Sequence, residues 1–341
     1  MHHWRAALRR SIAFAAYYSG LLWLYAAVTL RNRAVVLMYH RVLPDDADSF
    51  SSEGIVISPA TFELQLDFLR EHFTTLSAED FRNCLEHGSF PRRACLITFD
   101  DGWFDNERYA LPILEQYRIP AVLFAATGYI GGPGAFWQEE LTRMLFVASR
   151  SAAQHAPLLE HLGLASLVTA DAVEARHRAR AFVTALKAGN PAEVARAHKL
   201  LVEALGLGAG QCGFTGDDRF LSWDALRHLA AGGRFTVASH SHSHQPLTQL
   251  GRNGSAEDLL RSKQELERHG LLSPWMCAYP NGDHDPDVTE AARSVGFQMG
   301  FTTVSGRVSV GDDPLGLKRV NIHEWACSSR PEFLCHILGL F

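Results

Sequence analysis

The chain has 341 residues, of which 47% are hydrophobic and 20% charged, and its formal net charge is −5. This length and composition are typical of a globular protein that buries a sizeable core, as one large α/β domain or two ordinary ones. The acidic balance offers no basic surface for nucleic acid. Six cysteines without a C-x-x-C pair argue against a zinc ribbon or a disulfide framework.

The first expected element is an apolar segment at the N-terminus. Residues 11–30 carry no charge and have about the length that a helix needs to cross a bilayer. We interpret residues 1–33 as a spanning anchor, an amphipathic helix lying on the membrane, or a signal sequence. Arginines flank the segment, with a slight excess before it, which favours placing the rest of the chain outside the cytoplasm, at the inner membrane or in the periplasm of a bacterium. The flanking residues are Arg5, Arg9, Arg10, Arg31 and Arg33.

Short apolar runs bounded by polar or turn residues recur along the rest of the chain. Such near-continuous runs are typical of strands buried on both faces of a parallel sheet. Segments with helical spacing of apolar residues alternate with them, which predicts right-handed βαβ units in an α/β barrel or an open sheet. The expected strands cover 34–40, 94–102, 120–128, 234–240, 275–282, 297–303 and 318–323, and the expected helices 61–72, 106–117, 256–269 and 287–295.

One segment interrupts this alternation. Residues 138–213 are rich in Ala, Leu, Arg and His, have a helical pattern and contain no strand-like run. We interpret them as a helical insertion within a domain that covers 34–325. Glycine-rich stretches at 128–136 and 207–218 are its expected boundaries, and residues 326–341 are expected to form a helical tail.

Titratable residues close several of the expected strands. His40, Asp100 with Asp101, His240 and His323 each follow an apolar run. In α/β barrels the C-terminal ends of the strands form the active-site face. These side chains are therefore expected to meet at one rim.

The sequence Asp100-Asp101-Gly102 has two interpretations. Asp-Gly is a common turn dipeptide, so a solvated turn is one. The pair follows an apolar run, however, and adjacent carboxylates leaving a buried strand repel each other unless a cation or a proton relieves them. A functional pair is the other interpretation.

Three histidines alternate with serines at 239–244. On a strand, His240, His242 and His244 would share one face, whereas on a helical turn only His240 and His244 would. His-x-x-x-His spacing lets two imidazoles hold one metal ion, and a carboxylate from another strand end would complete the set. Such a site suits catalytic zinc or a non-haem iron oxygenase, but the compact H-x-D motif typical of the latter is absent.

These residues resemble a known family. Thr98-Phe99-Asp100-Asp101-Gly102 and His240-Ser241-x-x-His244 are similar to the first two motifs of the polysaccharide deacetylases, the NodB-homology carbohydrate esterase family. Residues 278–288 resemble its third-motif region. The resemblance covers about 34–325 apart from the insertion, and implies a distorted (β/α) barrel.

The resemblance also implies roles for the motif residues. Asp101, His240 and His244 would hold a divalent metal, zinc first, with cobalt, nickel or manganese as alternatives. Asp100 would be the general base that takes a proton from the attacking water. His242 would have no role and serves as an internal control.

The sequence departs from the family pattern in its third motif. Where many relatives have an arginine that orients the base, this chain has Ala278. We expect Arg319, on another strand, to supply a substitute charge.

The position of the general acid in the sequence also departs from the family pattern. The literal match to the family's L-x-H motif, Leu334-Cys335-His336, lies in the tail and is expected to be packing. The pair Tyr39-His40 resembles a permuted arrangement in family members acting on exopolysaccharides. His40 is therefore the preferred acid, His323 the second choice, and a water or no dedicated acid the third.

Together these features predict a metal-dependent hydrolase that removes acetyl groups from an acetylated polysaccharide. Two alternatives are a deacetylase-fold protein that binds glycan without turnover and an amidase acting on a small amide. Rim aromatics are expected to stack on sugar rings. The expected substrate contacts are Trp103, Tyr279, Pro280 and Asn281, with Trp137 as a further aromatic candidate.

Overall fold

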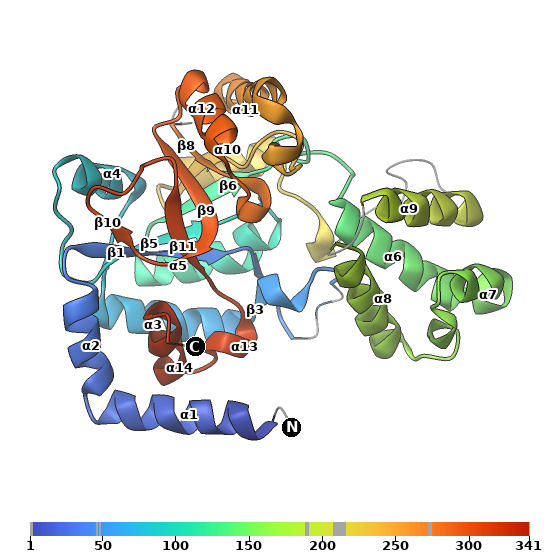
Figure 1. The fold of residues 1–341 in the computed structure, drawn as a ribbon, viewed down its shortest axis with the longest axis horizontal. Helices are drawn as coiled ribbons and strands as arrows, with labels where there is room; N and C mark the ends of the chain where they lie inside the picture. The colour runs from blue at the N-terminus through green and yellow to red at the C-terminus, as the bar shows by residue number, and fades with distance from the viewer. Residues whose placement is uncertain are drawn as a thin grey trace. The chain divides into compact units, whose positions relative to one another are not determined.

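The computed structural model describes residues 3–45, 47, 49–187, 191–206, 216–271 and 275–340. The chain forms two compact units (Figure 1). The first comprises Met1–Asp45, Glu53–Gly131 and Leu221–Phe341, and the second comprises Asp46–Ser52 and Gly132–Phe220. Five cysteines are free, and Cys212 lies outside the described residues.

The first unit is built around a closed barrel of parallel strands. Neighbouring strands pair in parallel from β1 to β5, and β1 pairs with β5 to close the ring. Each of the seven expected apolar runs supplies one strand, so the prediction of a (β/α) barrel is confirmed and the open sheet is excluded. In ring order the strands are β1 (Arg33–Tyr39), β11 (Leu317–Asn321), β9 (Met299–Ser305), β8 (Met276–Ala278), β7 (Phe235–Ser239), β6 (Ala121–Ala125) and β5 (Ala94–Phe99).

Short strands lie outside the ring. Strand β10 (Val308–Ser309) pairs antiparallel with β1, and β4 (Thr74–Thr75) pairs parallel with β5. A separate two-stranded sheet joins β2 (Arg41–Val42) to β3 (Val56–Ile57). None of these strands was predicted, because two residues are too few to carry a periodic pattern.

Helices cover the outside of the barrel and cap one of its ends. Several begin at side-chain caps: Ser58, Ser77, Ser222 and Asp285 each accept a hydrogen bond from a first-turn amide. The helices are α3 (Pro59–His72), α4 (Ala78–Glu86), α5 (Leu111–Tyr117), α10 (Trp223–Ala231), α11 (Gly251–Arg268), α12 (Pro286–Val295), α13 (Glu324–Cys327) and α14 (Arg330–Ile337), with short turns η1 (Glu53–Ile55), η5 (Leu247–Gln249) and η6 (Pro280–Gly282).

The helix expected over 106–117 is not uniform. Its first part, η2 (Asn106–Ala110), is a π-helix, and only Leu111–Tyr117 is α-helical. Pro112 has no N–H to donate to the carbonyl of Arg108, so the α-helical ladder is interrupted at this point.

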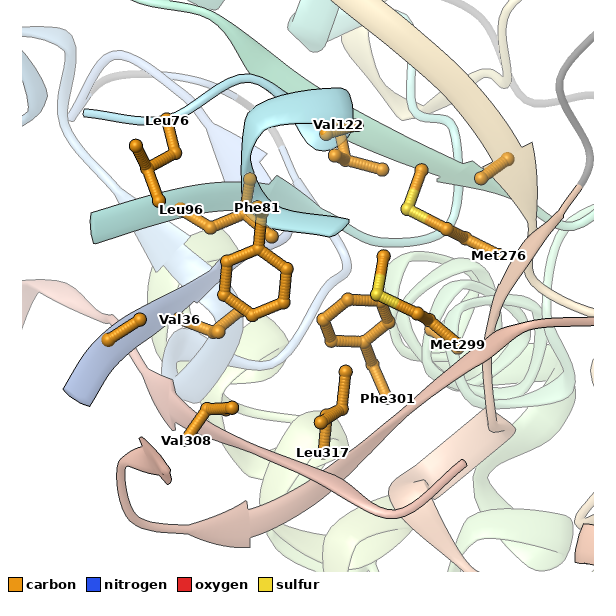
Figure 2. Close-up of a cluster of buried hydrophobic side chains, with 14 of the residues drawn as sticks. Val36, Leu76, Phe81, Leu96, Val122, Met276, Met299, Phe301, Val308 and Leu317 are labelled. Carbon is orange, nitrogen blue, oxygen red and sulfur yellow. The ribbon is translucent and has the colours of Figure 1, made fainter. Parts of the chain in front are cut away.

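Apolar side chains fill the barrel (Figure 2). Val36, Leu96, Val122 and Phe301 come from four different strands and point toward one another. Phe81 of α4 joins this cluster and lies 6.2 Å from Phe301 between ring centroids. The interior is therefore a packed core, which leaves the strand ends as the place for chemistry.

The N-terminal segment differs from the single helix expected over 11–30. It forms α1 (His3–Tyr18) and α2 (Leu21–Thr29), which meet at an angle of 81°. Gly20, at φ 83°, begins α2 in the left-handed region, which glycine adopts without strain. Among the described residues no single helix has the length and hydrophobicity of a membrane span, although this bent pair taken together meets both criteria.

The second unit is helical. Its own apolar cluster is drawn from helices α6 to α9. The helical segment predicted for 138–213 falls within this unit, although part of the expected 207–218 boundary lies outside the described residues. The helices are α6 (Trp137–Arg150), α7 (Ala152–His161), α8 (Ala172–Lys187) and α9 (Pro191–Leu205), with turns η3 (Ala165–Leu167) and η4 (Gly216–Asp218).

Candidate active site and metal centre

The two aspartates lie in a buried turn at the end of β5. Asp100 and Asp101 are 2% and 4% exposed, so the solvated-turn interpretation is wrong. The amide of Asp100 donates to the carbonyl of Tyr39 on β1, which continues the barrel pairing to this point. Asp101 has φ 78°, an uncommon value for a residue with a side chain. This left-handed turn directs two adjacent carboxylates to different partners.

The histidine loop begins where β7 ends, at Ser239. Residues 240–244 form neither a strand nor a helical turn, which corrects the expectation that His244 follows His240 by one turn of helix. Ser241 and His244 have φ 62° and 55°, so the backbone reverses twice within the loop. Left-handed residues with side chains are strained and persist only where their surroundings hold them.

Side-chain acceptors hold this loop in place of helical hydrogen bonds. Asp258 on α11 accepts from the amides of His242, at 2.7 Å, and Ser243, at 3.0 Å. Ser241 Oγ accepts from the amide of His244 at 3.0 Å. Ser239 Oγ accepts from the amide of Ser241 and lies 2.7 Å from Ser262 Oγ. The loop conformation is therefore set by side-chain acceptors, both from α11 and from the serines of the loop itself.

Asp101, His240 and His244 converge. Asp101 Oδ1 lies 3.4 Å from His240 Nε2 and 3.3 Å from His244 Nε2, and one ligand atom from each residue lies within 4.8 Å of the others. Two imidazole nitrogens and one carboxylate oxygen suit a divalent transition metal with open positions. His240 Nδ1 lies 2.8 Å from the carbonyl oxygen of Ala278. Because a carbonyl only accepts hydrogen bonds, Nδ1 must carry the proton, and Nε2 keeps a lone pair that can bind a metal.

His242 lies outside this cluster. Its Nδ1 lies 3.1 Å from Thr127 Oγ1, and its carbonyl accepts from the amide of Gly128. The ring is thus engaged with the end of β6 instead of with Asp101. This placement agrees with the expectation that His242 points away from the two neighbouring histidines.

Trp103 contacts the site from behind. Its Nε1–H donates to Asp101 Oδ2 at 2.8 Å, which turns Oδ1 toward the two histidines. The guanidinium of Arg41 lies 4.2 Å from the centre of the Trp103 ring and donates to Asp105 at 2.9 Å. Trp103 is fully buried, so the expectation that it stacks on a sugar ring is wrong.

Asp100 pairs with Arg319 of β11. Two guanidinium nitrogens donate to the two carboxylate oxygens at 2.7 Å each, and Nε donates to the carbonyl of Thr302 on β9 at 2.8 Å. Burial alone raises the pKa of Asp100, but the adjacent guanidinium and His240 bring it below its usual value. Asp100 is therefore held ionised and in a fixed orientation. Arg319 lies where the expected substitute charge would act on it.

His40 lies beside Asp100. Its Nε2 is 3.9 Å from Asp100 Oδ2, and its carbonyl accepts from Nδ2 of Asn106 at 2.8 Å. Its Nδ1 is buried and has no hydrogen-bond partner among the described residues. Burial lowers the pKa of His40, and the opposing effect of Asp101 and Asp100 only partly offsets this. The lowered pKa favours the neutral imidazole.

His323 and His336 lie next to each other near the end of β11. Their ring centroids are 6.1 Å apart, and His336 Nε2 lies 2.7 Å from the carbonyl of Asn321. Among the ion pairs of the described residues, none joins His323 to Asp100 or Asp101. The geometry favours His40 over His323 as the histidine next to the base.

The third-motif residues are mostly unavailable to a substrate. Tyr279 is fully buried, where its hydroxyl donates to the carbonyl of Leu315 at 2.8 Å and its ring stacks on His284, so stacking of Tyr279 on a sugar is also excluded. Pro280 is buried as well. Asn281 is exposed and has a left-handed φ of 56°.

The sequence interpretation missed the supporting residues of the site. Arg41, Asp105 and Asn106 position Trp103 and His40 through contacts between two segments. Only the closeness of Arg41 to His40, and of Asp105 and Asn106 to Asp101, hints at this in the sequence.

Comparison with known proteins identifies the family. A family model described as polysaccharide deacetylase matches residues 87–300, which is more than half of the chain. The chain belongs to the polysaccharide deacetylase family. The match contains both aspartates and the histidine loop, but His40 and Arg319 lie outside it.

Individual relatives share part of the chain. A poly-beta-1,6-N-acetyl-D-glucosamine N-deacetylase from Staphylococcus aureus is 37% identical over 112 residues, and one from Staphylococcus epidermidis is 33% identical over 113 residues. The first match covers 29% of this chain and 38% of the relative, so the shared part is well under half of either protein.

Solved structures show the same fold. The deacetylase PplD of Streptococcus pyogenes, solved in complex with acetate, is 18% identical with a TM-score of 0.58, over 90% of this chain and 98% of that one. IcaB from Ammonifex degensii is 21% identical with a TM-score of 0.55, over 90% and 97% of the two chains.

Proposed function

We propose that this chain is a metal-dependent amidase that removes N-acetyl groups from an exopolysaccharide of the poly-β-1,6-N-acetylglucosamine class. The observation that carries the proposal is the pairing of an Asp-His-His cluster with a separate, Arg-oriented carboxylate. The relatives named above supply the substrate class. The family membership and the barrel fold support the reaction class.

Asp101, His240 and His244 would hold the ion. A divalent ion, zinc being the first expectation, would supply Lewis acidity toward the acetyl carbonyl when bound. The donor set suits it because His240 Nδ1 is already engaged by Ala278 and Trp103 occupies the second oxygen of Asp101. These contacts preorganise the ligand atoms before an ion arrives.

Asp100 would act as the general base. The oxygen of water attacks the acetyl carbon, and one water proton goes to an oxygen of Asp100, which Arg319 keeps from rotating. The low pKa of Asp100 makes it a weak base that stays ionised and ready to accept this proton.

His40 would protonate the leaving nitrogen as the C–N bond breaks, which releases acetate and a free amine. Because burial favours the neutral ring, the proton that His40 donates is one that reaches Nε2 during the reaction. Asp100 Oδ2, at 3.9 Å, is the neighbouring source of that proton. This route returns both groups to their starting states.

Glycan binding without turnover is not favoured. That alternative rested on the missing third-motif arginine, and Arg319 contacts Asp100 through two hydrogen bonds instead. The small-amide alternative has no specific support from the site or from the relatives.

The test is acetate release from N-acetylated exopolysaccharide by the metal-loaded chain. Asp100→Asn is expected to lower kcat by on the order of a hundredfold or more while metal content stays at the wild-type level, because proton transfer is lost and the ligands remain. Asp224→Asn, which changes an exposed surface ion pair, is the matched control. Undiminished turnover in Asp100→Asn would contradict the assignment of the base.

A further inference from the structure

The bent helix pair at the N-terminus carries an exposed apolar surface. Seven of the fourteen exposed large apolar side chains among the described residues lie on α1 and α2. They follow helical spacing, so each helix presents one apolar stripe to solvent. We call these residues the apolar elbow; they are Leu8, Ile12, Tyr18, Leu21, Leu24, Tyr25 and Val28, with exposures from 41% for Tyr25 to 76% for Tyr18.

The opposite faces of both helices are packed against the first unit. Leu22 and Ala26 are buried on α2, and the Trp23 ring lies 5.8 Å from Phe68 of α3. Arg10 of α1 pairs with Glu332 of α14 at 3.4 Å. The apolar elbow is therefore the outer side of a pair whose inner side is already occupied.

The chain connection ties α2 to the barrel. Helix α2 ends at Thr29 and β1 begins at Arg33, so three residues separate the helix from a strand inside the ring (Figure 1). If α2 crossed a bilayer, it would have to separate from α3 and expose Leu22 and Ala26. If only the outer apolar stripes touched the bilayer, the packing of α2 against α3 would be unchanged.

The charge carried by the N-terminal segment itself is of one sign, and Glu332 of α14 pairs with Arg10 beside it. Residues 1–44 contain no Asp or Glu, although the whole chain is acidic. Arg9 and Arg10, in the middle of α1, and Arg31 and Arg33, just after α2, are exposed. Apolar stripes flanked by arginine match the interface of a bilayer that contains anionic lipid.

We propose that the apolar elbow docks this protein onto the surface of an anionic lipid bilayer, with its apolar side chains in the interface and without crossing. The gathering of seven exposed large apolar side chains on two adjoining helices is typical of an interaction surface. Basic residues beside it add attraction that salt screens. The docking does not depend on the catalytic assignment, because no residue of the elbow contacts the candidate active site.

The test is sedimentation of the full chain with phosphatidylcholine vesicles, with and without phosphatidylglycerol. Binding is expected to anionic vesicles and to weaken with salt. The triple variant Leu21→Glu, Leu24→Glu, Val28→Glu is expected to lower the partition coefficient by on the order of a hundredfold or more, because three buried apolar contacts are lost. The substituted side chains point to solvent, so the variant is expected to fold. Circular dichroism and metal content check this.

The matched control changes exposed apolar residues elsewhere. Val173→Glu, Val304→Glu, Trp325→Glu introduces the same charge at side chains of 73%, 49% and 73% exposure and is expected to bind as wild type. Three results would overturn the proposal. They are equal loss in the control, retention of the chain in membranes after alkaline carbonate extraction, and lipid-free dimerisation abolished by the elbow variant, which would make a second copy the occupant.

Discussion

Asp100 and Asp101 are neighbours in the chain with opposite partners. Asp100 receives two hydrogen bonds from Arg319, whereas Asp101 faces two imidazoles and receives one hydrogen bond from Trp103. The left-handed φ of Asp101 makes this divergence possible, since it turns the second carboxylate away from the first. One dipeptide thus supplies both a ligand oxygen and a separate base.

The histidine loop offers an internal comparison. His240→Ala and His244→Ala are each expected to lower metal affinity by more than about 100-fold, because each removes a proposed ligand nitrogen. His242→Ala is expected to retain wild-type affinity, since its ring contacts Thr127. Metal analysis after chelator competition measures all three variants, and equal losses in the three would contradict the ligand assignment.

Arg319 is expected to be needed for both stability and turnover. Arg319→Ala leaves the buried Asp100 carboxylate without its counter-charge, which is expected to cost about 3–5 kcal/mol of unfolding free energy. Arg319→Lys keeps a charge but loses the two-point contact, and is expected to lower kcat more than it changes KM.

Urea unfolding and acetate release measure these effects separately. Wild-type turnover in Arg319→Ala, with metal still bound, would remove Arg319 from the role of orienting the base. If Arg319→Ala unfolds, Arg319→Lys still tests the role of Arg319 in orienting the base, because lysine preserves the buried charge.

At the level of elements, the ends of the barrel strands could be predicted from the sequence. The residues that hold the site side chains in position could not. Buried parallel strands carry a local signal, an apolar run, and the residue after each run therefore marks the rim. His40, Asp100 and His240 were located in this way. The bend at Gly20 and the π-turn before Pro112 have local causes that an apolar pattern does not show, whereas the double reversal of the histidine loop depends on contacts with α11. Trp103 was misassigned for the same reason, because its burial follows from Arg41 on another segment.

The close approach of β8 and β9 depends on one glycine. A Cβ at Gly300 would lie 2.2 Å from Tyr279 Oη and 2.9 Å from the backbone carbonyl of Leu315. Gly300→Ala is therefore expected to destabilise the fold by about 1–3 kcal/mol through overpacking. Gly134→Ala is the control, since nothing lies within 4 Å of its added carbon. Urea unfolding of both variants tests the contrast, and equal midpoints would contradict it.

At the level of the whole molecule, the two units have separate cores. The apolar clusters of the barrel and of helices α6 to α9 share no residue. On the side of the first unit, the amide of Gly131 donates to the carbonyl of Leu221 at 2.9 Å, so the chain leaves and re-enters that unit at adjacent points. The segment Gly132–Phe220 is therefore an excursion from one position in the first unit, and the short segment Asp46–Ser52 of the second unit is a separate excursion.

Replacing 132–220 with a short glycine linker is accordingly expected to leave the barrel folded and able to bind metal. The two ends that the linker joins are already hydrogen-bonded to each other, so the closure entropy is small. Circular dichroism and metal analysis measure the outcome, and an unfolded or metal-free product would show that the barrel requires the second unit.

The pairing of Asp100 with Arg319 joins residues 219 positions apart. During synthesis the ribosome releases the aspartates long before β11, so the nascent barrel holds a carboxylate with no counter-charge and a β1 edge with no β11 beside it. Contacts between residues this far apart in the chain form late in folding, because the entropy cost of closing the long intervening loop comes before any stabilisation from the contact. The active site is therefore among the last parts of the protein to assemble, and a chain truncated before β11 would have both aspartates and the histidine loop without an oriented base.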